Sequence, residues 1–175
     1  MVLELKPAAA ALLGAGVNYL FDSGVMIDNV KFWGSPWQPR FNNWAFNLDR
    51  GEPLREKWAL IPKDLDVLVT HGPPLGILDL NGEGRPVGDA DLADRVLAVR
   101  PLVHAFGHIH ERGGRVISRV GTIFANAPIL DGMYAVTNEC IVINVVEAWR
   151  GKLVGSRFIA ISSLSGHVFG PWALV

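Results

Sequence analysis

Three histidines stand where their chemistry and their spacing favour a metal site. His71 lies in the segment T-H-G-P-P of residues 70–74, and His108 and His110 lie in G-H-I-H of residues 107–110. Neutral imidazole is a ligand of zinc, manganese, nickel and iron, and H-x-H in an extended segment directs both rings to one side. The neighbouring glycines let the backbone approach a ligand closely. We expect all three histidines to be metal ligands.

Both histidine segments follow apolar runs, residues 65–69 and 102–106, which are typical of buried strands. Between them, Asp89 can cap a helix that ends at residues 100–101 (Arg-Pro). The apolar positions of this helix recur at helical spacing: Leu92, Val96 and Val99. A right-handed crossover makes the two strands parallel, so the histidines emerge at one carboxyl edge, where ligands of α/β sheets bind. The sequence therefore predicts an α/β fold.

The other two histidines and one arginine carry weaker signals. We expect His104 and His167 to be ordinary hydrogen-bonded core or surface residues. The glycine-rich loop of residues 81–88 lies between His71 and the helix, close enough to the sheet edge to touch a substrate. Within it, Arg85 is the candidate substrate-binding residue, as a phosphate contact, although an exposed arginine in a polar loop is the ordinary case.

An aromatic-rich loop follows a hairpin predicted over residues 25–33, with its turn at Asp28 and Asn29. The loop contains Trp37, Phe41, Trp44 and Phe46. Such aromatics could stack a nucleobase or wall a substrate cleft, but packing of the loop on the sheet is the favoured interpretation. A short helix is expected over residues 52–58, ending before Ile61 and Pro62.

These segments together resemble the calcineurin-like metallophosphoesterases, and closely their metallophosphoesterase-domain-containing (MPPED-type) branch. The likeness runs from about residue 17 to residue 146. It rests on T-H-G-P-P, G-H-I-H-E, Y-L-F-D-S-G (19–24), F-W-G-S-P-W-Q-P (32–39), W-A-F-N (44–47), Trp58, Ile61-Pro62, Gly121-Thr122 and Asn126-Ala127. Asn126-Ala127-Pro128 departs from the N-A-S usual in the family, which puts any hydrogen-bonding role of that serine in doubt.

The resemblance implies a two-metal hydrolase of phosphate esters, phosphodiesters by expectation, in an α/β/β/α sandwich. His71 and His108 would bind one cation and His110 the other, and the metals that suit such a site are manganese, iron, zinc and nickel. The family draws its remaining ligands from D-x-H, G-D-x-x-D and G-N-H-E motifs. None of these motifs occurs in this sequence, so we expect the chain to be the carboxyl-terminal half of the domain.

That absence limits the expected activity. Three histidines without a bridging carboxylate cannot hold two cations close together. We expect weak metal binding and little or no hydrolysis by this polypeptide alone, and we assign no catalytic residue in it. Residues 1–146 are predicted to be a partial phosphoesterase domain and residues 147–175 an unassigned extension. A half domain should expose apolar surface and strand edges, which favours self-association or pairing with a partner chain.

Composition excludes several classes of partner. The 16 basic and 17 acidic side chains give a net charge of -1, without the basic patch that nucleic-acid binding requires. No run of about 20 apolar residues predicts a membrane span, and residues 1–16 favour a helix ending at Gly14 or Gly16 over a signal peptide. The single cysteine, Cys140, opens an apolar run (140–146) expected to form a buried strand, and it cannot form an internal disulfide. A reducing cytoplasm is the expected location.

Three functional hypotheses follow from these observations. The first, which we favour, is a metal-dependent phosphoesterase acting on a small phosphate ester, with this chain carrying part of its site. The second is a non-catalytic interaction module that keeps the sheet of the fold. The third is a cupin, which also uses H-x-H; the helix between the histidine segments counts against it, and Glu111 lies too close to the pair to be the glutamate a cupin needs.

Overall fold

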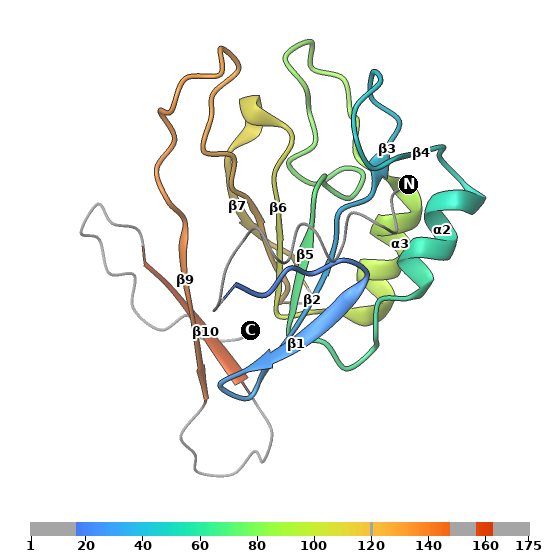
Figure 1. The fold of residues 1–175 in the computed structure, drawn as a ribbon. Coiled ribbons are helices and arrows are strands. Elements are labelled where there is room, and N and C mark those ends of the chain that lie inside the picture. The colour runs from blue at the N-terminus through green and yellow to red at the C-terminus, as the bar shows by residue number, and fades with distance from the viewer. Residues whose placement is uncertain (1–16, 120, 148–156, 163–175) are drawn as a thin grey trace.

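The computed structural model describes residues 17–119, 121–147 and 157–162, and its centre is a six-stranded mixed sheet (Figure 1). Its strands, in spatial order, are β1 (Ser23–Ile27), β2 (Val30–Ser35), β5 (Val67–Thr70), β6 (Val103–Phe106), β8 (Ile123–Asn126) and β7 (Gly114–Ile117). The four inner strands run parallel, while β1 and β7 are antiparallel to their neighbours. The expected α/β class and the parallel pairing of β5 with β6 are confirmed.

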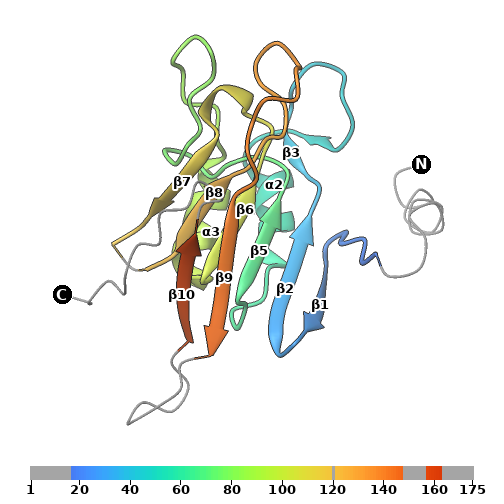
Figure 2. The ribbon, with the colours of Figure 1, turned by 90° about the vertical axis from the view of Figure 1, so that its left-hand side faces the viewer.

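The sheet carries helices on one face and a β-hairpin on the other. Helices α2 (Glu52–Ala59) and α3 (Ala90–Val99) lie together on one side, and β9 (Val142–Glu147) and β10 (Arg157–Ser162) form a separate antiparallel pair. Figure 2 shows this pair in front of the sheet and the helices behind it. The result is a helix, sheet, sheet layering, consistent with part of a phosphoesterase-type sandwich. Among the described residues no helix is long and apolar enough to cross a membrane.

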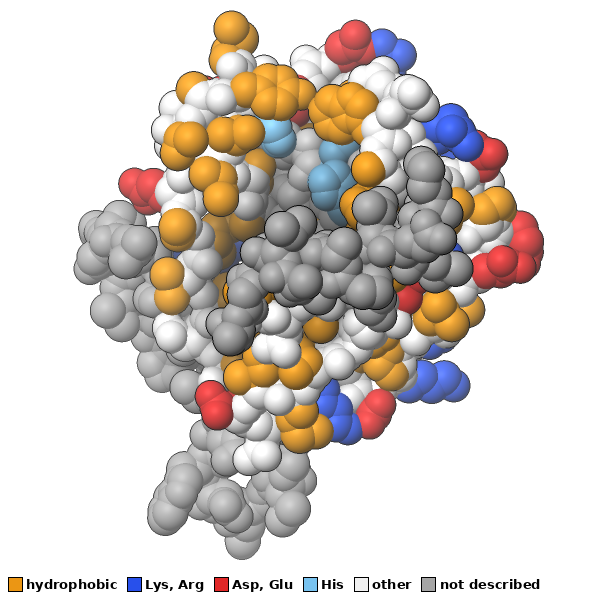
Figure 3. Space-filling model, in the orientation of Figure 1, with side chains coloured by type: hydrophobic (Ala, Val, Ile, Leu, Met, Phe, Trp, Pro, Cys, Tyr) orange, Lys and Arg blue, Asp and Glu red, His pale blue; other side chains and the backbone are white. Residues whose placement is uncertain are grey.

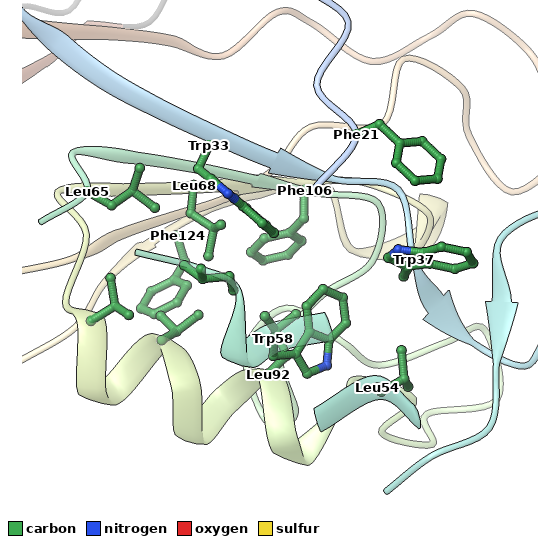
Figure 4. Close-up of a cluster of buried hydrophobic side chains, with 13 residues drawn as sticks. Phe21, Trp33, Trp37, Leu54, Trp58, Leu65, Leu68, Leu92, Phe106 and Phe124 are labelled. Carbon is green, nitrogen blue, oxygen red and sulfur yellow. The ribbon is translucent and has the colours of Figure 1, made fainter. Parts of the chain in front are cut away.

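The hydrophobic core fills the space between the sheet and the two helices (Figure 4). Trp58 from α2 and Leu92 from α3 are each 1% exposed and face Leu68, Phe106 and Phe124 from the strands. Burial removes apolar area from water, at about 25 cal/mol for each Å². The period of the apolar residues in each element therefore fixes which face of each helix turns inward.

The helix cap predicted at Asp89 is present and also serves the core. The Asp89 carboxylate accepts a hydrogen bond from the backbone N–H of Leu92 at 2.8 Å and another from the Trp58 indole N–H at 2.8 Å. Arg50 approaches the second carboxylate oxygen at 3.6 Å. The helix ends at Arg100, whose φ of 53° is left-handed, directly before Pro101. A single buried carboxylate thus joins the start of α3 to α2.

The hairpin and the short helix expected in the first third of the chain are confirmed. Asp28 and Asn29 connect β1 to β2, with φ angles of 47° and 61°. Positive φ at both central residues is what a two-residue type I′ turn requires, and Asn and Asp tolerate it best after glycine. Two-residue strands β3 (Gln38–Pro39) and β4 (Asn47–Leu48) then pair across the base of the aromatic-rich loop.

The strand expected from Cys140 begins later than predicted. The backbone N–H of Asn138 donates to Ile129 and its side-chain amide to Leu130, which keeps the chain up to this point in the preceding loop. Strand β9 starts only at Val142, where β10 supplies pairing partners. Cys140 is accordingly exposed and not part of a buried strand. The β9–β10 pairing also crosses the boundary placed after residue 146.

His104 is buried in the middle of β6, as expected for a structural histidine, whereas His167 and the helix proposed within residues 1–16 lie outside the described residues. The Thr70 hydroxyl donates to the Gly72 carbonyl at 2.8 Å, so it can only accept from His104 Nε2, also at 2.8 Å. That bond fixes the tautomer of His104. Burial lowers the pKa of this imidazole to about 3.

Replacing Leu92 by alanine tests the core. We expect Leu92→Ala to lower the free energy of unfolding by about 2–5 kcal/mol, because the side chain is buried and its removal leaves a cavity. The matched control is Leu97→Ala in the same helix, whose side chain is 60% exposed and should change the free energy by less than about 0.5 kcal/mol. Urea denaturation followed by circular dichroism measures both. Equal effects would contradict the packing described.

The buried His104 makes stability depend on pH. In the unfolded chain the His104 imidazole binds a proton near pH 6.5, whereas in the folded chain its pKa is about 3. The free energy of unfolding therefore falls as the pH decreases through this range. The slope should approach about 1.4 kcal/mol for each pH unit. His104→Phe, which keeps a ring among Phe106 and Phe124, should flatten the slope between pH 6.5 and 4.5. An unchanged slope in urea titrations at several pH values would refute this assignment.

Candidate functional site

The parallel strands β5 and β6 bring His71 and His108 together. Each strand ends one or two residues before its histidine, and the backbone N–H of Gly107 donates to the His71 carbonyl at 2.9 Å. His71 Nε2 lies 3.1 Å from His108 Nδ1, and the ring centroids are 4.8 Å apart. Their meeting at the carboxyl edge of the sheet follows from the crossover rule applied to the sequence.

The backbone of His108 is held in an uncommon conformation. Its φ of 69° is left-handed, a region that a residue with a β-carbon occupies at an energetic cost. Such strain persists where the surrounding structure enforces it, and it concentrates at functional sites. Here the conformation directs the imidazole toward His71. In the sequence, Gly107 suggested an unusual backbone conformation at this point. The residue with the left-handed φ is instead the next one, His108.

The facing nitrogens of His71 and His108 fit two ligands of one cation. Two nitrogens about 2.05 Å from a common metal, at an angle of about 100°, lie about 3.1 Å apart. Burial lowers the pKa of His71, with a further contribution from His110. Burial, then His71 and His110, lower the pKa of His108 to about 4, against a small opposing effect of Glu111. Both rings are neutral at pH 7, the form in which imidazole binds metals.

His110 reaches the same region from the short 3₁₀ helix η1 (His110–Arg112). Its Nδ1 lies 3.1 Å from the backbone carbonyl of Asp131. A carbonyl only accepts, so Nδ1 carries the proton, and Nε2 of the neutral ring keeps its lone pair; metal-binding histidines are commonly oriented in this way. Within the described part of the chain, however, no three His, Cys, Asp or Glu side chains converge on one point. His110 therefore stands apart from the His71 and His108 pair.

Asn126 supports the H-I-H segment, a role that sequence reasoning missed. This residue ends β8 and is completely buried. Its side-chain amide donates to the carbonyls of Ile109, at 2.7 Å, and Arg112, at 2.9 Å. The available signals were a polar residue at the end of an apolar strand and the place of Asn126-Ala127 in the family resemblance, and neither indicates its hydrogen-bond partners. These two hydrogen bonds fix the backbone on both sides of His110.

A cavity of about 250 Å³ opens beside the histidines. His108 and His110 line it, and Figure 3 shows histidine side chains in a hollow flanked by hydrophobic side chains. Phe41 and Trp44 approach the His108 ring edge-on, with centroids 5.2 and 6.2 Å away. Further lining residues are Pro39, Arg40, Arg50, Gly72, Pro73, Asn81, Val87, Ile109, Glu111, Gly132 and Tyr134.

The aromatic-rich loop divides its rings between the core and this cavity. Trp37 is buried and Phe46 packs against the core cluster, which agrees with the favoured packing interpretation. Phe41 and Trp44 are 44% and 48% exposed, contact each other at 5.1 Å and line the cavity instead. The packing interpretation is therefore confirmed for Trp37 and Phe46, whereas the role of Phe41 and Trp44 as the wall of a substrate cleft stays a prediction.

Arg85, the predicted substrate contact, lies away from the cavity. It is exposed and forms an ion pair with Glu83 within its own loop. The loop of residues 81–88 contributes Asn81 and Val87 to the cavity wall. The sequence identified the loop that borders the cavity, and the structure places other residues of that loop against it.

The sequence is similar to those of curated proteins from several animals, although no family model matches it. It is 46% identical over 129 residues to metallophosphoesterase domain-containing protein 1 of Homo sapiens, and equally to that of Mus musculus, covering 73% of this chain and 39% of each relative. A UPF0046 protein of Caenorhabditis elegans is 50% identical over 97 residues, or 55% of this chain and 24% of that protein. The chain thus spans about two fifths of the human and mouse relatives.

Among solved structures that resemble the fold is a crystal structure with a TM-score of 0.51, over 71% of this chain and 51% of the other. At 21% identity it supports the α/β architecture alone. The sequence relatives carry the assignment. The chain is a partial match to the metallophosphoesterase-domain-containing (MPPED-type) proteins.

Proposed function

We propose that the edge formed by His71, His108 and His110 is part of a metal-dependent phosphoesterase site. The observation that carries this proposal is the 3.1 Å approach of two neutral imidazoles, from adjacent parallel strands, beside a cavity of about 250 Å³. The name of the human and mouse relatives supports the reaction class. The substrate we propose is a small phosphate ester, with phosphodiesters favoured.

The three histidines would bind two different cations. His71 would bind through Nε2 and His108 through Nδ1, since these atoms face each other. His110 would bind a second cation through Nε2, because Asp131 holds its Nδ1. A bound cation supplies charge that polarises a phosphoryl oxygen and activates water. Manganese, iron, zinc and nickel all accept imidazole, so the donor atoms alone do not select among them.

The residues around the histidines would hold the imidazole rings in position and exclude water from one side of them. Phe41 and Trp44 cover one side of the His108 ring, and edge-to-face contacts favour that orientation. Asn126 fixes the segment that carries His110. A phosphate held near His108 would therefore meet rigid ligands and a partly apolar wall, which strengthens electrostatic contacts with the ester. Because no carboxylate completes the described donor set, we expect the chain's own affinity for metal to be low.

Manganese binding tests the assignment of the ligands. We expect the chain to bind Mn²⁺ weakly, and His71→Ala or His108→Ala to lower that affinity about tenfold or more, since each removes one of the two converging nitrogens. Electron paramagnetic resonance of free Mn²⁺ in a titration measures the affinity. The control is Glu56→Gln, which removes an exposed carboxylate of α2 without touching the site. Equal affinities for the histidine variants and the unmodified chain would reject the metal assignment.

A phosphate probe tests the reaction class separately. At a matched concentration of free Mn²⁺, the ³¹P resonance of inorganic phosphate should broaden more with the chain than without it when phosphate shares the site with the cation, and His108→Ala should remove this excess broadening while Glu56→Gln keeps it. Hydrolysis of bis(p-nitrophenyl) phosphate by the chain alone is expected to stay close to the rate of free Mn²⁺. Metal binding without any effect on phosphate would leave a metal site and exclude the phosphoesterase proposal.

A further inference from the structure

Two loops that border the cavity share one backbone design. In one, Leu80 bridges to Pro86; in the other, Leu130 bridges to Val136. Each bridge is followed by a polar residue whose side chain accepts two backbone N–H groups of its own loop. The sequences of the two loops, L-N-G-E-G-R-P and L-D-G-M-Y-A-V, share only leucine and one glycine, so the likeness is structural.

The polar residues at equivalent positions make equivalent hydrogen bonds. Asn81 Oδ1 accepts from the backbone N–H groups two and four residues later, at 3.1 and 2.9 Å. Asp131 Oδ1 accepts from the same two relative positions, at 2.9 and 3.0 Å. Both loops also close through a backbone bond from the residue three positions on. The two loops therefore have the same hydrogen-bonding pattern.

The third position after the polar residue shows where the loops differ. The first loop has Gly84 there, with φ of 74°; the second has Tyr134, with φ of 62°. Left-handed backbone suits glycine and strains an aromatic residue. The chain thus keeps a tyrosine where its own matching loop uses glycine, and an outlier of this kind points to a function of the side chain.

Tyr134 places its ring against the cavity wall that carries His110. The ring centroids of Tyr134 and His110 are 5.3 Å apart at 74°. Phe41 and Trp44 stand beside His108, so aromatic faces border the cavity at both histidines. All three aromatic side chains are between 44% and 63% exposed, which leaves ring surface for a ligand.

Both arginines that line the cavity have partners of their own. Arg40 is paired with Asp49 at 2.7 Å. Arg50 faces Asp89 and donates to the carbonyls of Val87 and Gly88 at 2.7 and 2.6 Å. Glu111 also lines the cavity, and none of the ion pairs among the described residues involves it.

The side chain of Glu111 lies beside both matched loops. A β-carbon at Gly82 would lie 3.1 Å from its Oε1, and one at Gly132 would lie 3.5 Å from its Cγ. These glycines occupy the same position in their loops, directly after Asn81 and Asp131. The carboxylate therefore sits between the loops because neither has a side chain there.

We propose that this cavity binds a quaternary ammonium group, with Phe41, Trp44 and Tyr134 providing aromatic faces and Glu111 the opposite charge. Aromatic rings and a carboxylate together recognise cations that carry no hydrogen-bond donor. The volume of about 250 Å³ suits a small ligand. The proposal that a cation binds here rests on the cavity alone. The further proposal that this cation is part of a substrate, a phosphoester of a choline-like alcohol, rests on the proposed function.

Comparison of choline with its neutral analogue tests the charge requirement. Choline chloride and 3,3-dimethylbutan-1-ol have the same shape and differ in the ammonium charge. Titration of each into the 175-residue chain with EDTA present, followed by tryptophan fluorescence and ligand-detected NMR, should show choline binding about tenfold tighter. Equal affinity would overturn the proposal by showing an apolar site, and so would the absence of binding.

Variants separate recognition from folding. Tyr134→Gly should weaken choline binding about tenfold while the melting temperature stays the same or rises, because glycine relieves the left-handed backbone. Glu111→Gln should weaken binding several-fold. The matched control, Met133→Ala, changes the neighbouring side chain, which is 87% exposed and outside the cavity lining, and should leave affinity unchanged. Unaltered binding in Tyr134→Gly would refute the role of the ring.

Two further measurements distinguish this site from the metal site and from a membrane surface. His71→Ala should keep choline affinity within about twofold, since His71 does not line the cavity, although it should lower Mn²⁺ affinity about tenfold or more. Failure of choline binding with intact metal binding would reject this inference alone. Soluble glycerophosphocholine should compete with choline; binding to phosphatidylcholine vesicles without such competition would contradict a soluble ligand.

Discussion

The parallel pairing of β5 with β6 is the constraint on which the candidate site depends. Val67 pairs with Val103 and Val69 with Ala105, so both strands end at the same edge of the sheet. A shift of one residue in this register would exchange the faces of one strand and separate the two histidines. The pairing is protected by full burial of Leu68 and His104 at its centre. The two histidines are therefore positioned by core packing.

A second layer of polar contacts converts this strand arrangement into fixed side-chain positions. Thr70 links the buried His104 to the Gly72 carbonyl, on the far side of His71. Asn126 holds the carbonyls of Ile109 and Arg112 on either side of His110. Buried polar groups cost free energy unless they are paired, and here the pairing is made with the loops that carry the site. The hydrogen bonds that satisfy these buried polar groups therefore also position the loops of the candidate site.

Sequence patterns predicted the parts of the fold that periodicity and capping determine. The strand, helix, strand order around Asp89 and the turn at Asp28 and Asn29 were accessible because each depends on neighbouring residues. The role of Asn126 was not, since its partners come from a loop 14 to 17 residues earlier in the chain. The start of β9 was misplaced because hydrophobicity alone does not reveal where a partner strand begins.

The candidate site was predictable to a similar extent. The approach of His71 to His108 follows from topology, which a sequence can indicate. The separate position of His110, and the placement of Arg85 beside Glu83, depend on loop conformations that no short pattern specifies. The strained backbone of Tyr134 is visible only by comparison with the matching loop in three dimensions. The order of helices and strands could be predicted from the sequence, whereas the conformations of the loops could not.

One contact near the helix cap links the sheet edge that carries His71 to the helical layer. Pro74 and Asp89 form a parallel bridge, with Leu75 N–H donating to the Asp89 carbonyl and Asp89 N–H to Pro73. A β-carbon at Gly88 would lie 2.5 Å from the Pro74 carbonyl oxygen, so the two segments are in close contact. Two backbone hydrogen bonds and this close contact therefore tie the T-H-G-P-P segment to the start of α3, so the position of His71 depends on how the helical layer packs against the sheet.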